Sequence, residues 1–175
     1  MRDGFFAKLK LFRWLELTKD AVIKQEQTDG SVATVGAAEL SVLDVAKKYV
    51  DLTAESTLTA LQTGSVFFLN SATEFATTLP APAAGLKFKF IVKAAPSGAA
   101  YTIVTASSAN IMIGGINELE TDTGDDGPYI ANGDSISFAD GVAVVGDYVE
   151  LESDGTSWYF HGQAKADGGI VLAST

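Results

Sequence analysis

Short runs of strand-forming residues recur about every ten residues between Ser56 and Gly162, and this spacing constrains the fold more than any other feature of the chain. Glycine, proline, asparagine and aspartate, which favour turns, punctuate the runs. The nine candidate strands are residues 57–61, 65–69, 75–79, 87–93, 101–105, 110–113, 135–139, 148–153 and 157–162. So many short strands predict a mainly β fold with an antiparallel β-sandwich or jelly-roll-like body.

Two candidate strands alternate between apolar and polar residues, which indicates one buried and one solvated face. The first alternation puts Leu86, Phe88, Phe90 and Val92 on one face and Lys87 and Lys89 on the other. Residues 148–153 alternate in the same way, and the Asp154-Gly155 turn that follows predicts a hairpin with residues 157–162. We expect Trp158 to point inward and Tyr159 to point outward or to lie at an interface.

Composition sets limits on stability and location. Hydrophobic residues make up 47% of the chain and charged residues 19%, which is typical of a folded protein with a real core. The absence of cysteine excludes disulfides, thiol catalysis and thiolate metal sites. No apolar run approaches the roughly 20 residues that cross a bilayer, and the first residues lack the apolar block of a signal peptide. We therefore expect a protein that is made in the cytoplasm and has no membrane partner.

Charge is distributed unevenly along the chain. Residues 1–24 carry six basic and three acidic side chains, whereas from Ala94 onward Lys165 is the only basic residue against twelve acidic ones. An acidic surface repels phosphate backbones, so we do not expect the main domain to bind nucleic acid. The front of the chain, in contrast, is basic and aromatic.

The N-terminal segment has an ambiguous pattern. Phe5, Leu9 and Phe12 follow helical spacing, while Leu9, Leu11 and Leu15 alternate as in a strand, so a short helix or an extended arm is expected. Residues 25–38 are small, polar and rich in glycine and predict a linker. We therefore divide the chain into an arm and linker at 1–40 and a β-sandwich body at 41–175.

Three roles for the arm remain open: docking on a partner, packing on its own domain, or lying on a membrane as an amphipathic helix. Docking is the preferred hypothesis, because its exposed apolar side chains need a partner surface. The candidate docking residues are Phe5, Phe6, Lys8, Leu9, Lys10, Phe12, Arg13 and Trp14.

The body shows a resemblance through the order of its motifs. These are TLT at 57–59, residues 64–70, TLP at 78–80, residues 85–90, YTIV at 101–104, GDYVEL at 146–151 and DGTSW at 154–158. In this order they resemble the β domains of tailed-phage virion proteins, over roughly residues 56–162. The resemblance implies a structural virion protein of the capsid decoration, cement or head-fibre type, often a homotrimer, and supplies no catalytic residue.

The residues offer little equipment for catalysis. His161 is the only histidine, and no Ser-His-Asp spacing surrounds it, so we expect no enzyme and no cofactor. Tyr159 and His161 lie on one face of an alternating strand and are candidate oligomer or glycan contacts. Asp122, Asp125 and Asp126 are a weak candidate for calcium, and an ordinary acidic loop is the preferred interpretation. Gly114-Gly115 and Gly168-Gly169 are expected to be turns, since no phosphate-binding glycine motif surrounds them.

The leading hypothesis is a decoration or cement protein on the capsid surface of a phage particle. Its arm would bind the major capsid protein and stabilise the shell, while the acidic bodies face solvent. The alternative is a receptor-binding head-fibre or tail-fibre module that recognises host surface glycans. An enzyme acting on host polysaccharides, which would need two facing carboxylates, comes third.

Overall fold

The computed structural model describes residues 22–26, 32–36, 48–71, 73, 75–120 and 127–174. The chain divides into two units, residues 1–44 and 45–175. In the first unit, β1 (Val22–Glu26) and β2 (Val32–Gly36) form an antiparallel pair in which Val22 lies opposite Gly36. Residues 25–38, where a linker is expected, contain the end of β1 and all of β2. Residues 1–21, which include all the candidate docking residues, lie outside the described residues.

The second unit is built almost entirely of strands. They are β3 (Tyr49–Leu52), β4 (Ser56–Thr57), β5 (Ser65–Leu69), β6 (Phe75–Thr78), β7 (Lys87–Val92), β8 (Tyr101–Val104), β9 (Met112–Glu118), β10 (Tyr129–Gly133), β11 (Ser135–Phe138), β12 (Tyr148–Ser153), β13 (Trp158–Ala164) and β14 (Ile170–Ala173). Two short 3-10 turns, η3 (Ala60–Gln62) and η4 (Ala106–Ser108), interrupt them.

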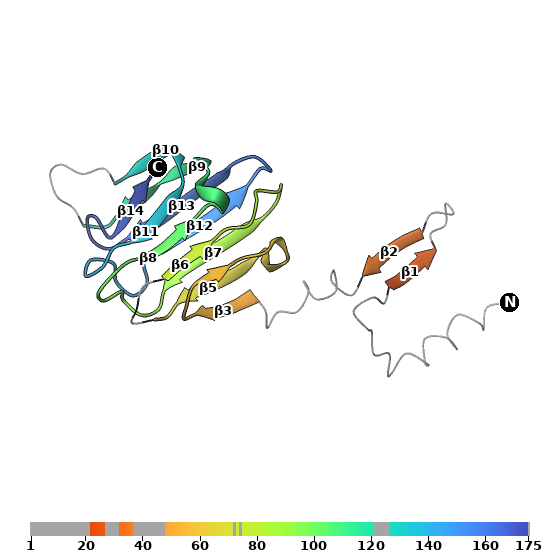
Figure 1. The fold of residues 1–175 in the computed structure, drawn as a ribbon, viewed down its shortest axis with the longest axis horizontal. Coiled ribbons are helices and arrows are strands. Elements are labelled where there is room, and N and C mark those ends of the chain that lie inside the picture. Colours follow the sequence, from red (N-terminus) through yellow and green to blue (C-terminus); the bar gives the residue numbers. More distant parts are fainter. Residues whose placement is uncertain are drawn as a thin grey trace. The chain divides into compact units, whose positions relative to one another are not determined.

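These strands form the two layers of a β-sandwich (Figure 1). One sheet has seven strands in the order β10-β9-β13-β12-β7-β5-β3, and the other has five in the order β14-β11-β8-β6-β4. The predicted mainly β sandwich is confirmed. Its ladders are mixed rather than antiparallel throughout, because β9 and β13, β3 and β5, β5 and β7, β4 and β6, and β6 and β8 pair in parallel.

The core fills the space between the two sheets. Alternation sends Phe88, Phe90 and Val92 of β7 inward, each no more than 2% exposed, as the sequence pattern predicts. Phe67 of β5 stacks on Phe90 with ring centroids 5.3 Å apart. Trp158 is fully buried, as expected, and its ring lies 5.6 Å from that of Phe88. Aromatic pairs of this kind stabilise the core beyond the area that they bury.

The predicted hairpin of residues 148–162 is also confirmed, with Glu152 opposite Tyr159 and Glu150 opposite His161. Its turn is organised by Asp154, whose carboxylate accepts hydrogen bonds from the backbone N–H groups of Thr156 and Ser157 at 2.7 and 2.8 Å. These bonds lower the pKa of Asp154 to about 2, the bond from Ser157 contributing most.

Several strand predictions need correction. In the run at 57–61 only Thr57 lies in a strand, β4, and the last two residues belong to the 3-10 turn η3, where the backbone N–H of Thr59 donates to the side chain of Gln62 at 2.8 Å. Gly114 and Gly115 lie inside β9 and not in a turn. A Cβ on Gly114 would lie 1.9 Å from the carbonyl oxygen of Phe160, so β13 can approach β9 this closely only beside glycine. The strands β10 and β14 were not predicted.

Candidate interaction surface

The outward side of the seven-stranded sheet carries the candidate site. Register aligns one outward residue from every strand into a single row across the sheet: Tyr49, Val66, Lys89, Glu150, His161, Gly115 and Tyr129. We call this side of the sheet the outer face. Because alternate residues point the same way, Asp51, Phe68 and Ile91 stand on the outer face in the neighbouring row.

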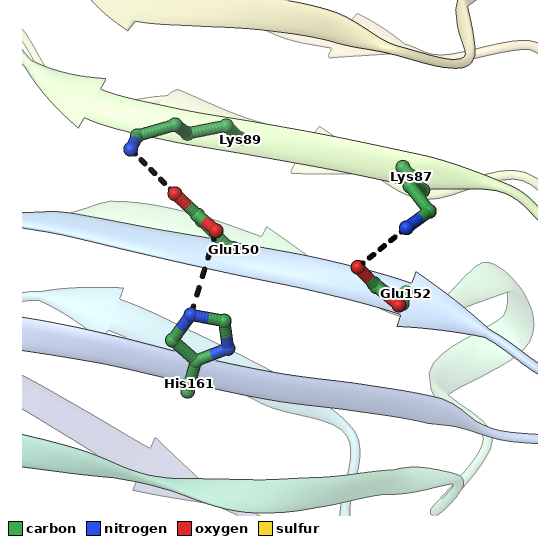
Figure 2. Close-up of polar contacts among 5 residues, drawn as sticks. All are labelled: Lys87, Lys89, Glu150, Glu152 and His161. Carbon is green, nitrogen blue, oxygen red and sulfur yellow. Dashed lines mark hydrogen bonds and ion pairs between the residues drawn. The ribbon is translucent and has the colours of Figure 1, made fainter.

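Paired charges occupy the middle of the outer face (Figure 2). Lys87 binds Glu152 at 2.8 Å, and Lys89 binds Glu150 at 2.5 Å. His161 reaches the second oxygen of Glu150 from the other side, with Nε2 3.4 Å away. The hydrogen bond from Lys89 lowers the pKa of Glu150 against the opposing effect of partial burial, and the charges of Lys89 and His161 lower it further.

Each of these ion pairs is solvent-exposed and adds little to stability on its own. Together they keep the surface potential of this part of the sheet close to neutral, since every lysine there stands opposite a carboxylate. Lys89 also lies over the ring of Tyr148, with its ammonium 4.4 Å from the ring centroid. The middle of the outer face is therefore both charge-balanced and ordered by contacts between neighbouring strands.

A groove of about 700 Å³ lies at the β3 end of the outer face. The charged part of its lining consists of Asp51 and Lys93. The rest of the lining is apolar or glycine: Tyr49, Phe68, Ile91, Val92, Val145 and Gly146. Lys93 binds Asp51 at 2.6 Å, and the side-chain amide of Asn70 donates to the same carboxylate oxygen at 3.2 Å. The bond from Lys93 is the main reason why the pKa of Asp51 is lowered. The groove thus combines apolar surface with a polar group that is already paired.

Exposed tyrosines mark both ends of the outer face. Tyr49 is 64% exposed at one edge, and Tyr129 is 70% exposed at the other. Tyr129 lies against Gly115, where an added Cβ would come within 3.5 Å of its ring. Tyr159 is exposed between them, on the same strand as His161. Exposed tyrosine is typical of protein and ligand contact surfaces, because it offers a large rigid ring with a polar end.

The predicted pair Tyr159 and His161 is where the sequence pattern put it, since both side chains point outward from β13 while Trp158 and Phe160 point inward. Their role in contacts stays a prediction. Asp122, Asp125 and Asp126 lie outside the described residues. Within the described ranges, no cluster of three metal-ligating side chains occurs.

Sequence reasoning missed most of the outer face. Tyr49 and Asp51 lie on β3, Phe68 lies on β5 and Lys93 directly follows β7, and a local pattern does not reveal the order of these strands in the sheet. Alternation in YVDL, SVFFL and KFKFIV does assign one residue set to each side of its strand, and that signal was present.

Among the residues that the structure describes, no helix is long and apolar enough to span a membrane. The chain matches no family model, no curated protein and no solved structure.

Proposed function

We propose that this chain is a non-enzymatic structural protein of a tailed-phage particle, and that it decorates and stabilises the capsid. The observation that carries the proposal is the contrast between a basic, aromatic N-terminal segment and an acidic β body. The resemblance of residues 56–162 to virion β domains supports the phage assignment. A β-sandwich whose two sheets enclose a hydrophobic core is a suitable body for such a protein.

In this proposal the arm makes the contact with the capsid. Its basic side chains bind acidic patches on the major capsid protein, and its phenylalanines and Trp14 fill apolar seams between subunits. One arm makes a modest contact, whereas several arms in an oligomer bind with avidity. The acidic bodies face solvent and keep particles apart by charge repulsion.

Removal of residues 2–20 tests the proposal, because this deletion stops short of the β1–β2 pair. Capsids of the parent phage that lack this protein are mixed with full-length or truncated chain and sedimented. We expect the truncated chain to remain folded and to bind capsids at least about tenfold more weakly. A matched full-length variant, Val171→Ala, changes an exposed apolar residue on β14 of the five-stranded sheet and should bind normally. Equal binding by full-length and truncated chains would remove the arm from the mechanism.

A receptor-binding fibre module is the second candidate, and the three exposed tyrosines on the outer face favour it. Glycans stack on such rings. A glycan array probed with the full-length chain tests this function: specific binding that Tyr159→Ala abolishes would support it, and an array without signal would count against it.

A further inference from the structure

We infer that copies of this chain associate through the outer face of the seven-stranded sheet, turning it toward the axis of the oligomer. This inference deepens the proposed function, because it names the surface that brings several arms together. Three independent features of the face carry it: its charge balance, its apolar content and its size.

Charge balance singles out this face. Lys87, Lys89 and Lys93 stand there against three carboxylates, those of Glu150, Glu152 and Asp51, each at hydrogen-bonding distance (Figure 2 shows the first two pairs). Elsewhere in the described part of the body, two lysines stand against eight carboxylates. Two copies carry the same net negative charge and repel each other, so they approach with least repulsion through a neutral face. A partner of opposite charge would bind the acidic remainder instead.

The charged groups of the face are already paired, which lowers the cost of burying them partly in an interface. Asp51 is bound by Lys93 and by Asn70, and Glu150 is bound by Lys89 and approached by His161. Burying charges that are already paired and hydrogen-bonded costs far less than burying single charges. Because the face carries both signs of charge, a lysine of one copy can, in addition, pair with a carboxylate of a second copy.

Apolar side chains gather on the same face. Of the eight large hydrophobic residues that are exposed in the described residues, four belong to the outer face or its groove: Tyr49, Tyr129, Val145 and Tyr159. The other four, Leu61, Leu119, Val142 and Val171, come from other parts of the body. Half-buried Phe68 and Ile91 extend the apolar surface into the groove. Tyrosine is enriched in protein interfaces, and here it lies at both ends of the face and on β13.

Size distinguishes a second copy from a small ligand. Six strand spacings of about 4.8 Å make the seven-stranded sheet about 29 Å wide. A standard interface, of about 800 Å² per partner, has a similar width. A single sugar ring would cover only a small part of this width. The features that the face shares from edge to edge therefore fit another protein surface.

The test is the oligomeric state of the full-length chain, measured by sedimentation equilibrium from about 0.1 to 100 µM, a range that brackets ordinary interface affinities. Val145 is 65% exposed in the groove, and Val145→Glu adds an unpaired negative charge there. Val171→Glu makes the same change at a 47% exposed position on β14 of the other sheet and serves as the matched control. Far-ultraviolet circular dichroism confirms that each variant is folded.

We expect the unmodified chain to be oligomeric, Val145→Glu to raise the dissociation constant roughly tenfold or more, and Val171→Glu to leave it unchanged. A monomeric unmodified chain would overturn the inference. So would an oligomer that Val145→Glu does not weaken, or one that both variants weaken equally. Capsid binding by the arm is measured separately, so a monomer that still binds capsids would overturn this inference and leave the proposed function standing.

Discussion

Replacing Thr77 with valine should stabilise the fold, because the hydroxyl of Thr77 is buried without a hydrogen-bond partner. Its side chain is fully buried in β6, and no described residue hydrogen-bonds to Oγ1. Ser56, which pairs in register with Thr77 from β4, likewise has a buried hydroxyl without a partner. A hydroxyl that leaves water without gaining a hydrogen bond opposes folding. Valine has the same shape and prefers strands.

The size of the effect follows from two contributions. An unsatisfied buried polar group costs about 1–3 kcal/mol, and a buried methyl group contributes about 0.8 kcal/mol. Rotation of the Thr77 and Ser56 hydroxyls toward each other would recover part of the first contribution. We therefore expect Thr77→Val to raise the free energy of unfolding by about 1–2 kcal/mol, because it removes an unsatisfied buried hydroxyl. For a domain of this length, the melting temperature should rise by about 3–6 °C.

Thr105→Val is the matched control. Thr105 is 1% exposed, and its hydroxyl donates to the carbonyl oxygen of Ala109 at 2.7 Å. The same substitution there removes a made hydrogen bond and should lower the free energy of unfolding by about 1–2 kcal/mol. Both variants are measured by urea unfolding at one protein concentration, since self-association shifts apparent stability. Equal loss of stability in both variants would refute the reasoning about Thr77.

The remaining predictions concern single sites in the body. Carbon-detected NMR titration should give Asp154 a pKa of about 2, below the ordinary value of 3.8 for an aspartate. Because that pKa is lowered, the stability that the Asp154 carboxylate provides is present above about pH 4 and is lost as the pH falls toward 2, so the melting temperatures of Asp154→Ala and the unmodified chain should converge there. Ser107 has left-handed backbone angles of φ 59° and ψ 27°, so Ser107→Gly should stabilise by about 0.5–1 kcal/mol and Ser107→Val should destabilise, as thermal unfolding will show. Gly114→Ala should destabilise by about 3 kcal/mol or more, because the new Cβ would collide with the Phe160 carbonyl, and unchanged urea unfolding would contradict the close approach.

The local sequence pattern was sufficient to predict a strand and its two faces wherever one face is buried and the other is exposed to solvent. The predicted bounds of β5 and β12 agree with the structure, and the faces of β7 were assigned correctly. Such alternation reflects burial directly and does not depend on which strand is the neighbour in the sheet. Tyr159 and His161 were placed correctly for the same reason, because their neighbours belong to one hairpin.

Pattern failed where tertiary contacts decide the conformation. Glycine at 114 and 115 predicts a turn from local propensity, whereas the approach of β13 to β9 requires glycine within a strand. Parallel neighbours such as β3, β5 and β7 are joined only by long connections, so their order leaves no local signal. The groove around Asp51 and Lys93 exists only once those strands are adjacent, and for that reason it was not foreseen.

Quantitative mass spectrometry of purified particles of the phage that we propose encodes this chain tests the central claim most directly. The number of copies per particle is measured relative to the major capsid protein. If the chain decorates the capsid, it should be present in a fixed ratio to the capsid lattice and should be retained on heads that have been separated from tails. Absence of the chain from purified heads, or a few copies found only with tails, would contradict the account.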